Sequence, residues 1–424
     1  MNVQIEHILL IVLLQLSVII AAARLFGMLF RRFGQPQVCG EIIAGLLLGP
    51  SVFGRYFPEI SAQVFSPVVN PVLSVISQIG LVLVMFLIGL EFDFSHLKKN
   101  RRAALSVSLA GVLLPFGLGM GLGGFLHRQL ALDGNWLHFS LFMATAFSIT
   151  AIPVLGRILI ELKLNRTMIG SLTITAAALN DAVGWVLLAL VTAISQAAFD
   201  PWNFAGMIAG IGVFALVMFL IVRPLAIRWI ASGPLSLDSV AMLLILIFLS
   251  AIATNLIGIF SVFGAFLFGA ILYDQGDFVA AIRARLSDFI TVFFLPIFFT
   301  FTGLRTDIGS MSGGELWLLC GLVLLTATAG KFGGCALAAR WNGLSWRQAS
   351  AIGIMMNTRG LMELIVINIG FDLGIIPRPV FFMLVFMAIV TTCMTAPVLR
   401  RLRPELPQPA VQRRSEGITS RPYS

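Results

Sequence analysis

The sequence is poor in charged residues. Asp, Glu, Lys and Arg together make up 11% of the 424 residues, whereas soluble globular domains contain about 25%. Hydrophobic residues make up 58%, and a bilayer-spanning helix requires roughly 20 mostly apolar residues. The apolar stretches are continuous rather than alternating, which excludes the strands of a transmembrane barrel. The composition therefore predicts an all-α polytopic membrane protein.

Cysteine and histidine are also scarce. The four cysteines have no paired spacing, so we expect free thiols among the helices. The four histidines all fall at the ends of apolar stretches. An intramembrane enzyme would need an activated nucleophile, paired aspartates or a histidine-based metal site within the spans. We therefore expect no enzyme and no cofactor.

Thirteen apolar stretches are long enough to be transmembrane candidates. They cover residues 5–30, 38–54, 69–91, 103–127, 137–160, 168–195, 204–230, 238–257, 260–273, 285–304, 316–339, 348–371 and 379–399. Most Lys and Arg residues fall in the odd-numbered connections, and the even-numbered connections hold only Arg55, Arg128, Arg305 and Arg378. The positive-inside bias then places the N-terminus outside the cell membrane and the C-terminus in the cytoplasm. The net charge of +9 reflects this topology, so lipid rather than nucleic acid is the expected partner.

The chain repeats itself weakly with an offset of seven stretches. The third stretch ends with Gly89-Leu90-Glu91-Phe92-Asp93, and the tenth ends with the similar Gly303-Leu304-Arg305-Thr306-Asp307. In the same way, Gly40 and Gly45 of the second stretch match Gly264 and Gly269 of the ninth. Because the offset is odd, equivalent helices cross the membrane in opposite directions. This is typical of the inverted-topology repeats of secondary transporters. We expect a transporter domain over residues 1–400, with one repeat at about 5–195, a linker helix at 204–230 and a second repeat at about 238–399. Residues 401–424 form a short basic cytoplasmic tail, so no appended regulatory domain is expected.

Few ionisable side chains lie deep inside a stretch, where each costs at least ~2.5–3.5 kcal/mol. Asp181 lies near the middle of the sixth stretch among small residues, and no basic residue of its own helix is within reach. Lys331 lies inside the eleventh stretch. Arg359 and Glu363 lie one helical turn apart in the twelfth, where they could neutralise each other as a structural pair. Asp181 is therefore the strongest candidate for a functional carboxylate.

Two stretches contain a predicted break. In the fifth, Pro153 lacks an N–H, so the carbonyl of Ile149 loses its helical donor and the helix should open. In the twelfth, seven stretches later, the sequence Asn357-Thr358-Arg359-Gly360 interrupts an otherwise apolar helix. Two broken helices in corresponding positions of two halves are typical of a transporter binding site.

These residues resemble one known family. The matching segments are Cys39 to Pro50, Ser148 to Pro153, Leu179-Asn180-Asp181, Gly303 to Asp307 and Asn357 to Leu364. Over about residues 5 to 400 the chain resembles the monovalent cation:proton antiporter-2 family, which includes Kef-type systems and plant cation/proton exchangers. The resemblance implies the sodium/proton antiporter fold, with about thirteen helices, usually in a homodimer whose core domains move against a dimerisation domain.

The resemblance also implies roles for individual residues. The acidic pair of the sixth helix binds the ion in this family, and its first member is Asn180 here, not Asp. Family members with Asn-Asp are regarded as electroneutral, so one proton per cation is implied. The basic residue of the eleventh helix matches Lys331, whose usual partner is the absent Asp. What Lys331 pairs with is therefore an open question.

We expect competition at Asp181 to drive transport. Burial disfavours an ionised carboxylate and a bound cation favours it, so Asp181 could hold either a proton or Na⁺ or K⁺. Asn180, Ser148, Thr150 and the carbonyl of Ile149 would complete an oxygen shell of the kind that hard cations prefer. Lys331, Arg359 and Glu363 would support this site. The alternatives are a K⁺ efflux channel-like system or a symporter on the same fold, an intramembrane enzyme, and a cation sensor that transports nothing.

Overall fold

The structure is a computed structural model that describes residues 2–65, 70–90, 101–162, 164, 167–195, 201–231 and 236–402. All regular secondary structure in these residues is helical, which confirms the all-α class. Glu91, Phe92 and Asp93 of the repeated motif lie outside the described residues, as do Lys163 and the tail beyond Leu402.

The first half of the chain contains nine helices among its described residues. They are α1 (Asn2–Arg32), α2 (Gln37–Leu48), α3 (Phe53–Tyr56), α4 (Pro58–Val64), α5 (Asn70–Leu90), α6 (Arg101–Gln129), α7 (Trp136–Ser148), α8 (Ile152–Glu161) and α9 (Met168–Ser195). The predicted linker region then contains α10 (Pro201–Val217), a π-helical turn η3 (Met218–Val222) and α11 (Arg223–Ala231).

The second half follows the same plan. Its helices are α12 (Leu237–Ile257), α13 (Ser261–Ala270), α14 (Gly276–Phe289), α15 (Leu295–Leu304), α16 (Gly314–Thr328), α17 (Gly334–Trp341), α18 (Trp346–Met356), α19 (Leu361–Asp372) and α20 (Arg378–Leu402). The π-helical turns η4 (Ile290–Phe294) and η6 (Ala329–Gly333) join α14 to α15 and α16 to α17, and a 3₁₀ turn η5 (Ile308–Ser310) follows α15.

The described helices are long and apolar enough for a polytopic membrane protein. Ten of them could cross a bilayer by length and composition, and the bent pair α18–α19 raises the number to eleven. Each of the thirteen predicted stretches contains a helix or a run of helices. The predicted stretch 38–54 lies within one candidate span, Gln37–Tyr56, but its helix is interrupted: α2 stops at Leu48, Gly49 is extended, and α3 begins at Phe53. Because a proline disfavours the helical conformation of the residue before it, Pro50 explains why the helix ends before Gly49.

Local sequence signals explain several helix ends. Ser236 caps α12 by accepting from the N–H of Ser239, and Gly258 ends the helix in the left-handed conformation that glycine adopts readily. Ser345 and Gln348 form a reciprocal capping box at the start of α18. Such pairs satisfy N–H groups that the first turn of a helix cannot pair internally.

Six helices form what we call the crossing group: α1, α2, α5, α12, α13 and α15. Here α2 crosses α15, and α5 crosses α13, so closely that a side chain does not fit. A methyl group on Gly45 would lie 2.0 Å from the carbonyl oxygen of Thr300, and one on Gly303 would lie 2.8 Å from the Cα atom of Gly45. At the other crossing, a methyl group on Gly89 would lie 3.0 Å from the Cα atom of Gly269.

The two crossings are related by the repeat predicted from the sequence. The offset of seven stretches pairs Gly45 with Gly269 and Gly303 with Gly89. Applied to the contact between Gly45 and Gly303, it gives the contact between Gly269 and Gly89, which the structure contains. Each half thus contributes one glycine to each crossing, as expected for two inverted repeats that interlock.

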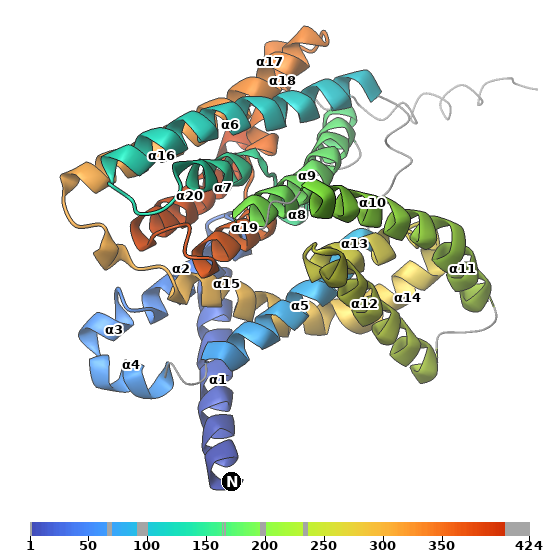
Figure 1. Ribbon diagram of the computed structural model, residues 1–424, viewed down its shortest axis with the longest axis horizontal. Coiled ribbons are helices and arrows are strands. Elements are labelled where there is room, and N and C mark those ends of the chain that lie inside the picture. Colours follow the sequence, from blue (N-terminus) through green and yellow to red (C-terminus); the bar gives the residue numbers. More distant parts are fainter. Residues whose placement is uncertain are drawn as a thin grey trace, which may run out of the picture.

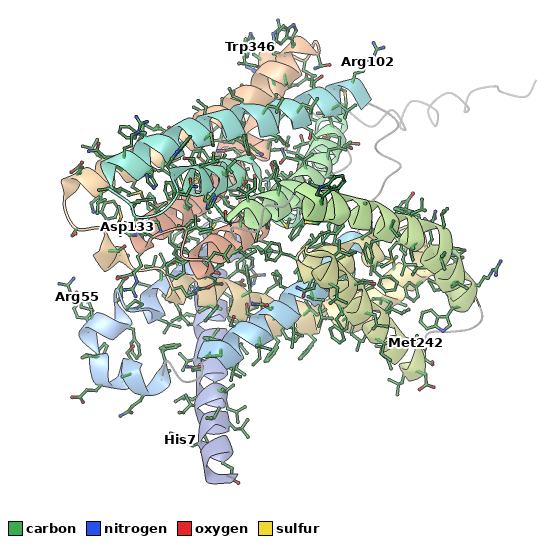
Figure 2. All side chains as sticks on the ribbon, viewed as in Figure 1. His7, Arg55, Arg102, Asp133, Met242 and Trp346 are labelled. Carbon is green, nitrogen blue, oxygen red and sulfur yellow. The ribbon has the colours of Figure 1, made fainter. Side chains whose placement is uncertain are left out.

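Nine other helices form what we call the broken-helix group: α6, α7, α8, α9, α16, α17, α18, α19 and α20. In Figure 1 this group occupies the upper part of the view and the crossing group the lower part. The labelled Arg102 and Trp346, both from odd-numbered connections, lie near the upper edge of Figure 2, whereas Arg55 and Asp133, from even-numbered connections, lie near its left edge.

Candidate functional site

Both predicted breaks are present. The helix α7 ends at Ser148, and α8 begins at Ile152 after three extended or irregular residues. The helix α18 ends at Met356, and α19 begins at Leu361 with a bend of 42° between the two. Backbone groups at helix ends lack helical partners, so each break exposes carbonyl and N–H groups inside the protein.

The two breaks contact each other directly. The N–H of Ala151 donates to the carbonyl oxygen of Thr358 (3.1 Å), and the hydroxyl of Thr150 donates to that of Met356 (3.2 Å). A methyl group on Gly360 would lie 2.8 Å from Val154 Cγ2, so glycine at this position lets the second break approach α8 without displacing the Val154 side chain. The interrupted segments therefore satisfy part of each other's backbone hydrogen bonding, as buried polar groups require.

Arg359 links the second break to the end of the first broken helix. It is fully buried, and its Nη1 and Nη2 atoms donate to the carbonyl oxygens of Ala146 (2.8 Å) and Phe147 (3.0 Å) near the end of α7. Nη1 also donates to Glu363 Oε1 (3.1 Å), so the predicted pair forms. A positive charge at a helix C-terminus is favourable because the last carbonyls carry partial negative charge. Arg359 thus stabilises the dipole of α7, while Glu363 lies in the first turn of α19.

The last helix holds the second break in place. The hydroxyl of Thr392 in α20 accepts from the N–H of Arg359 (3.1 Å) and donates to the carbonyl oxygen of the same residue (2.6 Å). The hydroxyls of Thr358 and Thr395 are 3.2 Å apart. The Thr392 hydroxyl thus replaces missing helical partners of Arg359, and the Thr358–Thr395 contact ties the break to α20.

Lys331 has a defined set of partners, which answers the question left open by the sequence. It is fully buried in the π-helical turn η6. Its Nζ atom donates to the carbonyl oxygen of Gly111 (2.8 Å) and to that of Ser148. The amide of Asn180, oriented so that both of its atoms are satisfied, accepts from Lys331 Nζ (3.1 Å) and donates to the carbonyl oxygen of Ser148 (2.7 Å). Among the described residues, these partners are neutral.

Asp181 is buried beside this cluster, and one oxygen of its carboxylate is not hydrogen-bonded to the described residues. Its side chain is 6% exposed, and its Oδ1 atom has no hydrogen-bond partner among the residues that the structure describes. Lys331 and the backbone N–H of Ile152, the first residue of α8, are its electrostatic partners. An unpaired carboxylate oxygen in the interior is costly unless a proton or a cation accompanies it.

The predicted oxygen ligands surround the first break. The single proton of the Ser148 hydroxyl is shared between the carbonyl oxygens of Ala144 (2.7 Å) and Val112 (3.2 Å), and the Thr150 hydroxyl donates to the carbonyl oxygen of Met356. A hydroxyl that donates its proton in this way keeps its oxygen lone pairs available for a cation. The side chain of Ile149 packs over Gly184, one turn beyond Asp181. Asp181, Asn180, Ser148, Ile149 and Thr150 therefore lie in one region, with Lys331 on one side.

Three contributors to this region, Thr392, Thr395 and Gly111, were not predicted from the sequence. Thr392 and Thr395 lie in the last apolar stretch, where the close spacing of Thr391, Thr392 and Thr395 was a usable signal. Gly111 contributes only a backbone carbonyl, which no residue type reveals.

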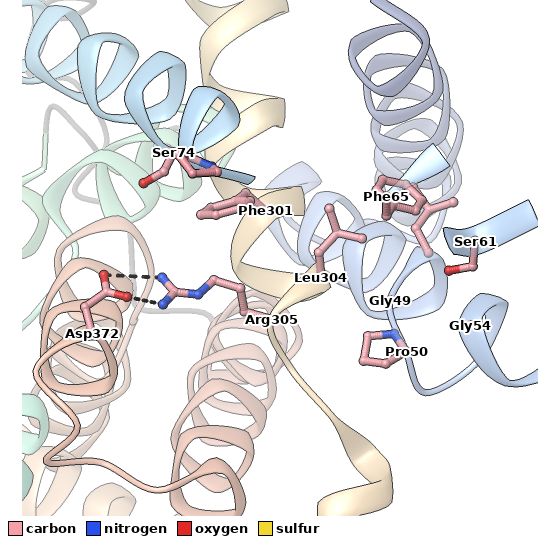
Figure 3. A pocket seen from close by; sticks show the side chains of 12 residues that line it. Gly49, Pro50, Gly54, Ser61, Phe65, Ser74, Phe301, Leu304, Arg305 and Asp372 are labelled. Atoms are coloured by element: carbon pink, nitrogen blue, oxygen red, sulfur yellow. Dashed lines mark hydrogen bonds and ion pairs between the residues drawn. The ribbon is translucent and has the colours of Figure 1, made fainter. Parts of the chain in front are cut away.

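A separate cavity of about 590 Å³ lies between the two groups of helices (Figure 3). Its lining residues come from α2, α3, α4, α5 and α15 and the residues next to these helices, with Asp372 of α19 at the edge, and they include none of the predicted site residues. Arg305 and Asp372 form an ion pair at its edge. The cavity lies at the C-terminal ends of α2, α15 and α19.

Comparison with protein families matches residues 18–401 to the family described as sodium/hydrogen exchanger, transmembrane. The Na(+)/H(+) antiporter NhaS4 of Synechocystis sp. is 38% identical over 402 residues, which cover 93% of this chain and 98% of that protein. Cation/H(+) antiporter 17 of Arabidopsis thaliana is 39% identical, covering 93% of this chain and 48% of that protein. K(+)/H(+) antiporter 1 of Saccharomyces cerevisiae is 32% identical, covering 93% and 46% respectively. The chain thus spans nearly all of the cyanobacterial relative and about half the length of the plant and yeast relatives.

A solved structure has the same fold. The sodium proton antiporter MjNhaP1 from Methanocaldococcus jannaschii matches with a TM-score of 0.66 at 15% identity, covering 92% of this chain and 97% of that one. This likeness confirms the predicted sodium/proton antiporter fold.

Proposed function

The chain belongs to the sodium/hydrogen exchanger family, and from this premise we propose that it exchanges Na⁺ or K⁺ for protons at Asp181. The observation that carries the proposal is the buried Asp181 carboxylate, whose Oδ1 atom has no partner among the described residues although it lies beside two broken helices. Relatives in this family carry names that refer to Na⁺ and to K⁺.

Competition at one carboxylate is sufficient for antiport. A buried carboxylate is stabilised by neutralisation, either by a proton or by a bound cation, and the two cannot occupy it together. The positive charge that acts on Asp181, that of Lys331, is held by two backbone carbonyls and by Asn180. Because these partners restrain the ammonium group, Asp181 keeps its unpaired oxygen for the transported ion.

We expect the cation to be held by oxygen atoms only. Asp181 supplies the charge, and the hydroxyl oxygens of Ser148 and Thr150 and the carbonyl of Ile149 supply neutral ligands, which suit hard monovalent cations. Asn180 acts mainly by holding Lys331 and Ser148 in position. Since Asn180 carries no charge, only one carboxylate of the pair can titrate, so we propose an electroneutral exchange of one proton for one cation.

The division into two groups of helices suggests how the site could alternate between the two sides. The glycine contacts at Gly45 and Gly89 leave no room for α2 and α5 to slide against their partners, so the crossing group is the rigid scaffold. We propose that the broken-helix group, formed from parts of both repeats, moves against this scaffold. The scaffold would also form the contact of a homodimer in the cell membrane, with the N-terminus outside and the tail in the cytoplasm.

Exchange in proteoliposomes tests the proposal. Purified protein is reconstituted with an imposed pH gradient, and Na⁺, K⁺ and Li⁺ are added in turn while internal pH is followed. We expect at least one cation to dissipate the gradient with the wild type and none with Asp181→Asn. The control Asp238→Asn removes the same charge from an exposed position and should exchange normally. Exchange by Asp181→Asn would refute the assignment, and cation flux without proton movement would indicate a channel.

A further inference from the structure

Pro115 lies inside the helix α6, which continues through it without a break. Proline has no backbone N–H, so the carbonyl four residues earlier loses its helical donor. That carbonyl belongs to Gly111, and its oxygen accepts instead from Lys331 Nζ at 2.8 Å. The ammonium group thus takes the place of the N–H that proline lacks.

The backbones of α6 and η6 are close enough for the Lys331 ammonium group to reach the carbonyl oxygen of Gly111. Gly330, next to Lys331, lies against Pro115, where a methyl group would come within 3.1 Å of the Pro115 Cα atom. Lys331 lies in the π-helical turn η6, a local widening that is frequent at functional sites. The close approach and the π-helical turn together bring a lysine from one core helix to the freed carbonyl of another.

We infer that Pro115 is a positioning residue for Lys331: the carbonyl that it frees on Gly111 anchors the ammonium group beside Asn180 and Asp181. The inference rests on the proposed function of Asp181 for its consequence in transport, but the anchoring contact stands independently of it. The other partners of Lys331 are Ser148 at the end of α7 and Asn180 in α9. Without the Gly111 carbonyl, the Lys331 ammonium group would have one hydrogen-bond acceptor fewer and would be free to approach Asp181.

A stability experiment tests the contact without any transport assay. Lys331→Met keeps the aliphatic stem but leaves the buried Gly111 oxygen without a donor, whereas the Ser148 oxygen keeps its bond from Asn180. Pro115→Ala returns an N–H to the helix at the position that serves Gly111. We therefore expect the double variant to unfold in detergent at a midpoint about 2 °C or more above that of Lys331→Met. A double variant no more stable than Lys331→Met, or one that does not fold, would overturn the inference.

A transport experiment tests the positioning role. Pro115→Ala alone should change the half-saturating cation concentration by about threefold or more, in the same direction as Lys331→Met. The double variant should match Lys331→Met, because Pro115 acts only through the lysine. Independent, multiplicative effects would contradict this role.

Gly117→Ala provides the matched control. It lies in the same turn of α6, and no atom lies within 4 Å of the position of its added methyl group. The substitution stiffens the helix as Pro115→Ala could, but it gives Gly111 no donor. We expect unchanged cation dependence and no rescue of Lys331→Met. A rescue by Gly117→Ala would show that helix stiffening, not the restored N–H, is responsible. If Asp181→Asn retains exchange while the stability rescue is observed, the proposed function fails and the anchoring contact stands.

Discussion

Arg305 at the end of α15 forms an ion pair with Asp372 at the end of α19, and so joins the crossing group to the broken-helix group (Figure 3). Arg305 Nη1 also donates to Asn368 Oδ1 in α19 (2.9 Å), and its guanidinium carbon lies 5.0 Å from the ring centre of Phe371. Several contacts from one side chain thus hold the two groups together beside the cavity. If the groups move against each other during transport, these contacts must break.

Neutralising this pair should change the rate of transport but not the binding of the cation. We expect Arg305→Gln and Asp372→Asn to raise the maximal exchange rate by up to about fivefold, the effect of roughly 1 kcal/mol for a partly exposed pair. The half-saturating cation concentration should stay unchanged, since Asp181 is not touched. Both quantities are measured in proteoliposomes under an imposed pH gradient.

The reversed pair provides the control for this prediction. Arg305→Asp combined with Asp372→Arg restores opposite charges across the same boundary, so its rate should return toward that of the wild type. Rates that simply multiply the effects of the two single changes would show that the side chains do not act together.

The hydroxyl of Thr392 should be essential to the second break. Thr392→Val keeps the shape of the side chain but leaves the N–H and carbonyl of Arg359 without their partner, at a cost of about 1–3 kcal/mol for each buried group. We expect a lower thermal midpoint and at least a tenfold loss of exchange, with most activity retained by Thr392→Ser. The neighbouring Thr391→Val serves as control, because the Thr391 hydroxyl donates to carbonyls of its own helix. Equal losses from both valine variants would contradict a specific role for Thr392.

The glycine crossings should tolerate no side chain. A methyl group on Gly45 would overlap the carbonyl oxygen of Thr300, and one on Gly269 would lie 2.2 Å from that of Phe86. We therefore expect Gly45→Ala and Gly269→Ala each to destabilise the protein by roughly 1–3 kcal/mol or more, the range of overpacking in a closely packed interior. Thermal unfolding in detergent measures the loss. Gly212→Ala in the linker, where no atom lies within 4 Å, should leave stability unchanged. A stable Gly269→Ala beside an unstable Gly45→Ala would argue against equivalent crossings.

The sequence predicted the features that depend on residue type and spacing. Apolar length marked the helices, and Pro153 and Asn357 to Gly360 marked the two breaks, because a missing N–H or a run of polar residues interrupts a helix wherever it occurs. The repeat was visible through Gly45, Gly89 and their counterparts. Asp181 stood out because a carboxylate without a nearby basic residue is expensive in the membrane.

Contacts between distant segments could not be predicted in this way. Lys331 bonds to backbone carbonyls of Gly111 and Ser148, and any residue type supplies a carbonyl, so the sequence contains no sign of them. The pairing of Arg359 with the end of α7 depends on how two broken helices cross. Periodicity and composition describe one helix at a time, whereas these partners depend on packing between helices.

Asn180→Asp should convert the neutral partner of Lys331 into a charged one. In the described structure Asn180 accepts from Lys331 and donates to Ser148, whereas an aspartate could only accept, so the Ser148 oxygen would lose one donor and the lysine would gain a counter-charge. The second carboxylate adds a titratable group to the site. When protons enter the vesicle, we expect a membrane potential that is negative inside to accelerate exchange by this variant. Exchange by the wild type should be insensitive to the same potential.

The measurement is the initial rate of Na⁺-dependent proton movement with and without the potential. Asn180→Ser, which is also small and polar but adds no charge, should remain insensitive. A wild-type rate that follows the potential would refute one-for-one exchange, and an insensitive Asn180→Asp would show that the charge of residue 180 does not set the stoichiometry.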